Sequence, residues 1–461
     1  MPVQRLVVIG GDAAGMSAAA QARRSAPVDD LEVLAFERGP RTSYAACGLP
    51  YLVGGEVADA TRLVARTPEQ FRANGIDVQV RHEVVEVDTA ARRVCVRDLD
   101  AGTERHEPYD QLLIATGARG VRPPLPGIDA GGVLELRTID QAAELEQVLT
   151  TGARRAVVVG GGYIGIEVAE ALVARGLDVA MVEMAEHCMA TVLDPSMASL
   201  VDDAVRAGGV DLRLGTPVAG FAVKDGRVRG VETGSGGLDA DVVVLGLGVR
   251  AETGLADAAG VPVGRAGGIV VDNTMHTPVD GVWAAGDCVE SHHRVSGRPA
   301  VVALGTHANK QGRVAGTNIA AVVRGDAPTA RFGGVLGTAV TRFQRTEVGR
   351  TGLTAGEATE LGHDIVAVTT EAPSRARYYP GGEPMQILVV AERVGGRLLG
   401  AQIVGGDASA KRIDVLATAL WNDMTVDEIG GMDLSYAPPF SPVWDPVLLA
   451  AGKAAAAVAR P

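Results

Sequence analysis

The sequence contains few aromatic residues and no excess of positive charge. Aromatic residues make up 3% of the 461 positions, whereas hydrophobic residues make up 47% and there are 60 glycines. This composition indicates many tight turns between strands and helices, with cores of valine, leucine and alanine, and it favours an α/β protein over an all-β sandwich. The formal net charge of −13 excludes a nucleic-acid partner, because a protein that neutralises phosphates needs an excess of lysine and arginine.

Long apolar runs are also missing. No stretch reaches the ~18 residues needed to span a bilayer, since the apolar segment from Val447 to Val458 is interrupted by Lys453. Met1-Pro2 is followed almost at once by the apolar run from Leu6 to Ile9, which leaves no room for a signal peptide. We therefore predict a soluble, cytoplasmic protein with no membrane partner.

Cysteine is scarce and scattered. The four cysteines are Cys47, Cys95, Cys188 and Cys288. Their spacing fits neither a disulfide framework nor paired zinc ligands, so we expect no metal site. We interpret Cys95, Cys188 and Cys288 as structural, and Cys47 needs a separate explanation.

One motif occurs twice. The segments RLVVIGGDAAGMSAAAQARR, at the start, and RAVVVGGGYIGIEVAEALVARG, about 150 residues later, each combine a buried-strand run, a glycine turn and an alanine-rich helix. This pattern is typical of the start of a dinucleotide-binding βαβ unit. In the second copy, Gly160, Gly162 and Gly165 complete the fingerprint G-x-G-x-x-G, and the next strand ends at Glu183.

The first copy departs from the fingerprint at one position. Gly10 and Gly15 occupy the outer positions, Asp12 replaces the middle glycine, and the next strand ends at Glu37. In such a unit the glycines let the backbone approach a pyrophosphate, and the acidic residue accepts hydrogen bonds from ribose hydroxyls. One fingerprint alone could be only a tight turn, but two, each followed by its acidic residue, predict two dinucleotide sites.

Two later segments complete a larger pattern. YDQLLIATGA ends after Thr116-Gly117, and TPVDGVWAAGDCVE contains Gly286-Asp287. A glycine fingerprint, then A-T-G, then a second fingerprint and then A-x-G-D is an order that resembles the two-dinucleotide-domain flavoprotein disulfide reductases. The resemblance covers essentially the whole chain.

This resemblance implies an α/β fold with two Rossmann-like, three-layer dinucleotide-binding domains and an α+β C-terminal dimerisation domain. An FAD-binding domain would comprise residues 1–118 and 249–327, an NAD(P)H-binding domain residues 119–248, and the dimerisation domain residues 328–461. The residues implied to contact FAD are Gly10, Asp12, Ala14, Gly15, Glu37, Arg38, Thr116, Gly117, Gly286, Asp287 and Gly305. Those implied to contact the nicotinamide nucleotide are Gly160, Gly162, Tyr163, Ile164, Gly165 and Glu183.

Glu183 also bears on the choice of nicotinamide nucleotide. Its carboxylate would repel the 2′-phosphate of NADPH, so we expect a preference for NADH. Arg175 on the preceding helix, or a residue remote in sequence, could still support NADPH.

Cys47 lies in the segment TSYAACGLPY without a second cysteine to pair with. The glutathione-reductase branch uses a C-x-x-x-x-C disulfide at this place, but Thr42 and Leu52 occupy the two positions at the required spacing. That branch also uses a histidine of the C-terminal domain, and here no histidine follows His363. Cys47 could instead form a mixed disulfide with a small thiol, or a sulfenic acid.

These two options correspond to two branches of the family. Coenzyme A disulfide reductases and related persulfide reductases store a mixed disulfide, whereas NADH oxidases and peroxidases store a sulfenic acid. The peroxidase-like enzymes carry a histidine inside the first glycine turn, which here reads GGDAAG. The absence of this histidine argues against a peroxidase.

Three segments are similar to the coenzyme A branch. SYAACGLPY resembles its active-site motif, and ARYYPGG and SYAPPFSP match its two C-terminal tyrosine motifs. The resemblance implies catalysis by Cys47 with Tyr378 and Tyr436, which would be donated across a homodimer; packing at the interface is the alternative role for the two tyrosines. The implied substrate contacts are Gln21, Arg24, Ser43 and Ala46, although the family often has asparagine where this chain has Ala46.

We therefore expect electrons to pass from NADH through FAD to Cys47 and on to a small disulfide, either coenzyme A disulfide or a persulfide. A lowered pKa of the Cys47 thiol is expected from the flavin environment and from a helix that begins nearby. One alternative is an NADH oxidase or peroxidase that reduces oxygen through a Cys47 sulfenic acid. The other is a redox-sensing flavoprotein with little turnover.

Overall fold

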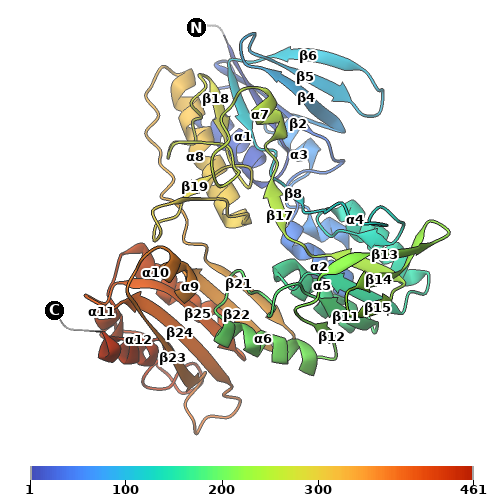
Figure 1. Cartoon of the computed structure of the whole chain (residues 1–461). Helices are drawn as coiled ribbons and strands as arrows, with labels where there is room; N and C mark the ends of the chain where they lie inside the picture. Colours follow the sequence, from blue (N-terminus) through green and yellow to red (C-terminus); the bar gives the residue numbers. More distant parts are fainter. Residues whose placement is uncertain (1–2, 459–461) are drawn as a thin grey trace.

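The computed structural model describes residues 3–458. Figure 1 shows three bodies: one built from both the blue and the yellow segments, one from the green segments and one from the orange to red segments. The first body is therefore assembled from two stretches of chain that are far apart in sequence. The second body is inserted between those stretches.

The first body is built on a parallel sheet. Its strand order is β18 (Val282–Ala284), β7 (Gln111–Ile114), β1 (Gln4–Ile9), β2 (Leu31–Glu37) and β3 (Asp77–Val80). The sheet is covered on both faces, which is why its central strands are continuous apolar runs. One face packs against α1 (Ala13–Ser25) and α8 (Gly305–Val323), and the other against the antiparallel strands β4 (His82–Asp88), β5 (Arg93–Asp98) and β6 (Glu104–Pro108).

Helices α1 and α8 approach closely. A Cβ atom at Gly312 would overlap the carbonyl oxygen of Ala14, and one at Gly316 would overlap that of Ala18. Glycine at these two positions, one turn apart on α8, therefore allows the two backbones to touch. The contact joins the first stretch of the chain to the stretch that follows the inserted body.

The second body repeats the same plan. Its parallel sheet has the order β12 (Asp211–Arg213), β11 (Asp178–Val182), β10 (Arg155–Val159), β16 (Val242–Leu245) and β9 (Val133–Leu134). Helices α4 (Ile139–Thr150), α5 (Tyr163–Ala174) and α6 (Pro195–Ala207) contribute to the core on one face. The antiparallel strands β13 (Val218–Lys224), β14 (Arg227–Thr233) and β15 (Gly236–Asp239) cover the other face.

Two short strands carry the chain between the first two bodies. β8 (Ala118–Gly120) and β17 (Val249–Ala251) pair antiparallel, with Ala118 opposite Ala251. They lie next to the expected domain boundaries at 118/119 and 248/249.

The third body is an antiparallel sheet with helices. Its strand order is β21 (Ala339–Phe343), β22 (Thr346–Gly352), β25 (Leu398–Gly405), β24 (Pro384–Glu392) and β23 (Ile365–Pro373). Its core is shared with α10 (Ile413–Trp421), α11 (Val426–Gly430) and α12 (Pro446–Ala457). The predicted fold class, two Rossmann-like domains plus an α+β domain, is confirmed.

Two negative findings concern residues 3–458 only. No helix in this range is both long and apolar enough to cross a membrane. Nor does this range bring three or more His, Cys, Asp or Glu side chains together in a group that could hold a metal ion.

Candidate active site

The first fingerprint turn joins β1 to α1 and leaves almost no room for side chains. Gly10 has φ +109°, and a Cβ atom there would overlap the carbonyl oxygen of Ala115. A Cβ atom at Gly15 would overlap the carbonyl oxygen of Gly10. Both positions therefore require glycine, and the tight turn brings the N-terminus of α1 to the carboxyl end of β1.

Glu37 is fixed beside this turn from the end of β2. Its Oε2 atom accepts a hydrogen bond from the backbone N–H of Gly11 at 2.7 Å, and its Oε1 atom accepts one from Gly39 at 2.6 Å. The carboxylate thus lies where the acidic residue of a dinucleotide unit contacts a ribose. The neighbouring predicted contact Arg38 is exposed, whereas Ala14 is buried on α1.

The surroundings of the turn fit a flat, anionic cofactor. Cβ atoms at Gly117 and Gly305 would meet no other atom within 4 Å, so both glycines border open space. Gly305 begins α8, whose N-terminal amide groups favour negative charge. The residues present therefore fit FAD, with Glu37 at the ribose, the turn at the pyrophosphate and the α8 N-terminus at the ring. Thr116, Gly286 and Asp287 lie at the ends of the two adjacent strands.

Asp12 is unusual in this turn. It is the N-cap residue of α1, but its side chain forms no capping hydrogen bond. Burial raises the pKa of the Asp12 carboxyl to about 6, with further contributions from the negative charges of Glu37 and Asp287. Three acidic groups therefore surround the site at which an anionic cofactor would bind.

This arrangement predicts a pH-dependent affinity for FAD. As the pH rises above about 6, Asp12 loses its proton, and its negative charge should weaken binding of the diphosphate. Asp12→Asn should remove this dependence and bind FAD about tenfold more tightly at pH 8, the equivalent of one pKa unit. The measurement is fluorescence titration of apoprotein with FAD from pH 5 to pH 8. Asp29→Asn, which changes an exposed carboxylate outside the turn, is the control and should retain the wild-type slope.

The second fingerprint turn has the same construction. Gly160 has φ +104°, and a Cβ atom at Gly165 would overlap the carbonyl oxygen of Gly160. A Cβ at Gly162 would meet nothing within 4 Å, so open space adjoins the middle position. Glu183 Oε2 accepts a hydrogen bond from Gly161 N–H at 2.6 Å, and its Oε1 accepts one from Ala185 N–H at 2.7 Å.

Tyr163 and Ile164 begin α5 directly after this turn. The Tyr163 hydroxyl is buried without a hydrogen-bond partner, and burial raises the pKa of this phenol to about 12. A buried polar atom without a partner is costly, so a ligand that supplies one would be favoured here. The second turn therefore fits a nicotinamide nucleotide.

Arg175 does not lie at the second nucleotide site, so the suggestion that it could support NADPH is wrong. Its guanidinium forms hydrogen bonds with both carboxylate oxygens of Glu146, at 2.7 and 2.8 Å, and with the carbonyl oxygen of Val53 at 2.8 Å. A different pair, which the sequence did not indicate, lies just after Glu183. His187 Nδ1 is 2.7 Å from Asp202 Oδ2, on α6.

Replacing Glu183 should change the preference between the two nicotinamide nucleotides. Glu183→Ala removes the negative charge that would repel a 2′-phosphate, together with the acceptor for the ribose hydroxyls of NADH. We expect the ratio of kcat/KM for NADPH to that for NADH to rise by about ten- to a hundredfold, equivalent to about 1.4–2.8 kcal/mol. Steady-state kinetics with both nucleotides measure this ratio. Glu186→Ala, at an exposed neighbouring position, should leave it unchanged; an equal change in both variants would argue against a specific role of Glu183.

Cys47 is the one exposed cysteine, since Cys95, Cys188 and Cys288 are buried. It lies in a short 3₁₀ helix, Ala46–Gly48, which leads into α2 (Leu49–Gly54). The loop before it is tied to the first fingerprint turn by a hydrogen bond from Ser43 N–H to the carbonyl oxygen of Gly11, at 3.0 Å. The predicted contacts Ser43, Ala46 and Cys47 therefore lie beside the predicted FAD site.

The protein groups around Cys47 act against the expected lowering of its pKa. Partial burial raises the pKa of the Cys47 thiol, and the negative charges of Glu167 and Asp287 add to the rise. The short helix α2 begins two residues after Cys47. Neither carboxylate is close to Cys47 in sequence, so the sequence did not indicate their contribution.

Gln21 and Arg24 lie near the C-terminal end of α1. The Arg24 guanidinium donates a hydrogen bond to Gln21 Oε1 at 2.9 Å. At a rise of about 1.5 Å per residue, Gln21 lies roughly 13 Å along α1 from the fingerprint turn. A substrate would have to be long to reach from these two side chains to Cys47, and their role stays a prediction.

Tyr378 and Tyr436 come together in the third body although their positions are 58 apart in sequence. Tyr378 is 76% exposed, Tyr436 is 47% exposed, and they lie in two loops of this body. A hydrogen bond to Tyr378 raises the pKa of the Tyr436 phenol. Large apolar side chains that follow Tyr436 in sequence, Phe440, Val443 and Trp444, are also exposed.

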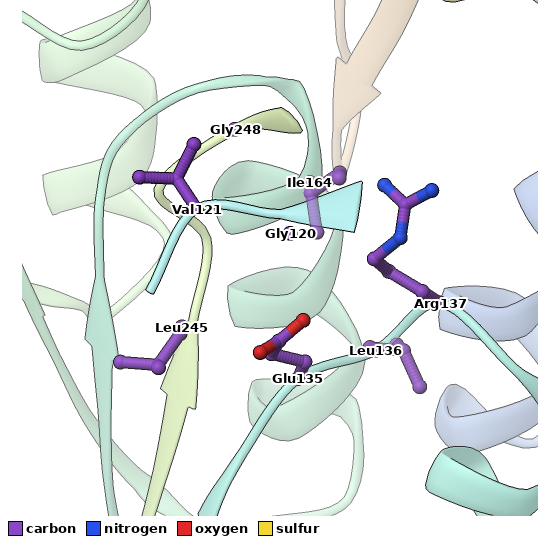
Figure 2. Close-up of a pocket in the computed structure, with 8 residues that line it drawn as sticks. All are labelled: Gly120, Val121, Glu135, Leu136, Arg137, Ile164, Leu245 and Gly248. Carbon is purple, nitrogen blue, oxygen red and sulfur yellow. The ribbon is translucent and has the colours of Figure 1, made fainter. Parts of the chain in front are cut away.

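A small cavity marks the junction between the two nucleotide units. Figure 2 shows the residues that line it. Gly120 and Gly248 belong to the connecting segments, Ile164 lies at the start of α5, and Glu135 and Arg137 lie in the loop that follows β9. Its volume of about 10 Å³ has room for about one water molecule. Arg137 also faces the first unit, where its positive charge opposes the rise that burial causes in the pKa of Asp287.

Proteins of known sequence and structure resemble this chain over nearly its full length. It is 39% identical to an NAD(P)H sulfur oxidoreductase (CoA-dependent) of Pyrococcus abyssi, over 97% of both chains. It is 36% identical to an NADH oxidase of Methanocaldococcus jannaschii, over 97% of this chain and 98% of the relative. A solved NAD-dependent persulfide reductase from A. fulgidus superposes with a TM-score of 0.93 at 37% identity, covering 98% of this chain and 83% of that one.

The sequence also matches two family profiles. Residues 4–312 match the pyridine nucleotide-disulphide oxidoreductase profile, and residues 338–446 match the dimerisation domain of the same family. Enzymes of this family use FAD and NAD(P)H, in agreement with the two fingerprint turns described above. The chain therefore belongs to the pyridine nucleotide-disulphide oxidoreductase family and is an FAD-dependent NAD(P)H oxidoreductase.

Proposed function

We propose that this enzyme reduces coenzyme A disulfide or a related persulfide, using Cys47 as its only redox-active thiol. The observation that carries the proposal is the single exposed cysteine: Cys47 is joined through its loop to the first fingerprint turn, while the other three thiols are buried. An enzyme without a second cysteine has to store its oxidised state as a mixed disulfide or a sulfenic acid. The CoA-dependent sulfur oxidoreductase and the persulfide reductase among its relatives favour the mixed disulfide.

The proposed reaction balances as RS–SR + NADH + H⁺ → 2 RSH + NAD⁺. FAD, which the first fingerprint turn and Glu37 would hold, would supply the electron pair of NADH to the sulfur of Cys47. In the stored state Cys47 is bonded to one thiol, and the incoming electron pair breaks that S–S bond and releases the thiol. The freed Cys47 thiolate then attacks a new disulfide, forms the mixed disulfide again and displaces the second thiol.

Other residues of the chain have supporting roles in this proposal. The two fingerprint turns bind the nucleotides, with Glu37 and Glu183 at the two riboses. Gln21, Arg24, Ser43 and Ala46 contact the thiol substrate, and Tyr378 and Tyr436 donate a proton to the leaving thiolate across a homodimer. The match of residues 338–446 to a dimerisation domain supports this dimer. We place the activity in the cytoplasm, where NADH is available.

The direct test is the intact mass of the FAD-loaded protein under non-reducing conditions, before and after dithiothreitol. A reducible adduct of coenzyme A mass on the Cys47 peptide is the expected result. A sulfenic acid on Cys47, together with oxygen uptake that is faster than disulfide reduction, would instead support the NADH oxidase function that one relative carries.

A further inference from the structure

The helix that follows Cys47 packs directly on the helix of the second fingerprint. A Cβ atom at Gly54, at the end of α2, would lie 3.4 Å from Ala171 of α5. Arg175, one turn further along α5, donates a hydrogen bond to the carbonyl oxygen of Val53 at 2.8 Å. One turn toward the N-terminus from Ala171, α5 carries Glu167, and α2 carries Tyr51 at the corresponding level. The unit that carries the second fingerprint therefore packs against the helix that follows Cys47.

The C-terminal domain holds side chains of α5 in place. The hydroxyl of Thr341, on β21, donates a hydrogen bond to Glu167 Oε1 at 2.8 Å. The next residue, Arg342, lies 3.6 Å from Glu170, which is three residues further along α5. Three parts of the chain thus meet here: the Cys47 helix, the start of α5 and the first strand of the dimerisation domain.

The two glutamates of α5 differ in how their charges are balanced. Arg342 forms two hydrogen bonds with Glu56, at 3.0 and 2.8 Å, and its guanidinium also lies 5.8 Å from the centre of the Tyr51 ring. Glu170 and Glu56 therefore share one arginine. Within residues 3–458, the neutral hydroxyl of Thr341 is the one hydrogen-bond partner of the Glu167 side chain. No cation of this range forms an ion pair with it, in contrast to Glu170 and Glu56.

We propose that Glu167 acts as a positioning residue that sets the protonation state of Cys47 and so the pH at which this thiol reacts. The inference rests on the proposed function only in taking Cys47 as the reactive thiol. When Glu167 is ionised, its charge opposes formation of the Cys47 thiolate. Without this charge, the thiolate forms at a lower pH.

The charges that face the two groups agree with this coupling. Burial raises the pKa of the Glu167 carboxyl, and the Thr341 hydrogen bond opposes that rise. Burial is the largest cause of the raised pKa of the Cys47 thiol. The charges of Glu167, Asp287 and Asp12 raise it further. Burial raises the pKa of the Tyr51 phenol, and the charges of Glu167, Glu170 and Glu56 raise it further. Arg342 opposes this rise. Of the three carboxylates at Cys47, Glu167 contributes most to the rise.

Glu167→Gln tests the proposal. The FAD-loaded protein is reduced with dithiothreitol and desalted, and the rate of alkylation of Cys47 by iodoacetamide, an uncharged probe, is measured from pH 6 to pH 10. The midpoint of the wild-type profile should move down by about half a pH unit in the variant, as expected for removal of one charge several ångströms away. Below the midpoint, the alkylation rate should rise about threefold. Mass spectrometry of the Cys47 peptide confirms the site.

Two further variants distinguish this role from a general structural effect. Glu170→Gln removes a carboxylate from the same helix whose charge Arg342 balances, and its profile should match that of the wild type. Thr341→Val removes the hydroxyl but leaves the Glu167 carboxylate, which stays negatively charged at the alkaline pH where the Cys47 thiol titrates, so its midpoint should stay close to that of the wild type. Glu167→Ala serves if Glu167→Gln does not fold.

Coincident profiles for wild type and Glu167→Gln would overturn the proposal, as would an equal shift for Glu170→Gln or Thr341→Val. Alkylation does not require turnover, so these results are independent of whether the enzyme reduces coenzyme A disulfide. If the enzyme does not reduce coenzyme A disulfide, the proposed function fails, but the alkylation profiles still test the coupling between Glu167 and Cys47.

Discussion

Replacing Cys47 with serine should reduce NADH-dependent turnover of coenzyme A disulfide by on the order of 10³-fold or more, as expected for loss of a nucleophile. The serine hydroxyl cannot form a mixed disulfide, so the electron pair has no acceptor between the flavin and the substrate. FAD should remain bound, because Cys47 is exposed and does not form part of the fingerprint turn. NADH should therefore still bleach the flavin absorbance under anaerobic conditions.

Cys95→Ser is the matched control for this experiment. Cys95 is a buried thiol on β5, whose Sγ atom lies 3.8 Å from Glu104, and its replacement should leave turnover close to that of the wild type. Disulfide turnover that persists in Cys47→Ser would rule out the proposed role of Cys47. Bleaching that disappears in Cys47→Ser would show instead that the substitution had disturbed the nucleotide sites.

The two nucleotide-binding units could be predicted from the sequence because their turns impose local steric requirements. At Gly10 and Gly160 the backbone has a positive φ, and at Gly15 and Gly165 a side chain would overlap a carbonyl group of the turn. Each requirement involves residues a few positions apart and leaves a fixed glycine spacing in the sequence. The apolar strand before the turn supplies the second local signal. The fold class followed from these signals and from the family resemblance.

The charges that surround Cys47 could not be predicted from the sequence in the same way. Glu167 is 120 residues from Cys47 (167 − 47), and Thr341, which holds it, comes from a third domain. Only the folded chain brings these groups together, so the sequence did not indicate that protein groups raise the pKa of the Cys47 thiol. The lowering expected from the flavin stays a prediction. The expectation that Arg175 could support NADPH was wrong for a similar reason. Its partner Glu146 lies on α4 and holds the Arg175 side chain away from a nucleotide.

The two tyrosines differ in exposure, and we propose that this difference sets an order of proton donation. A hydrogen bond to Tyr378 raises the pKa of the Tyr436 phenol. In this proposal Tyr436, which is 47% exposed, donates to Tyr378, and the Tyr378 O–H donates to a leaving thiolate. Tyr378, which is 76% exposed, would be the residue that contacts substrate, and Tyr436 would orient it.

Tyr378→Phe should accordingly reduce kcat for coenzyme A disulfide by about 10²-fold, the usual scale of a lost general acid. Tyr436→Phe should reduce it by about tenfold, and the double variant should resemble Tyr378→Phe, because Tyr436 acts through Tyr378. Tyr379→Phe is the control, since this neighbour is 37% exposed and has no place in the pair. Size-exclusion chromatography checks that each variant keeps the oligomeric state of the wild type. Equal losses in Tyr378→Phe and Tyr379→Phe would indicate packing at the interface, the alternative role for this segment. Additive losses in the double variant would contradict the proposed order of donation.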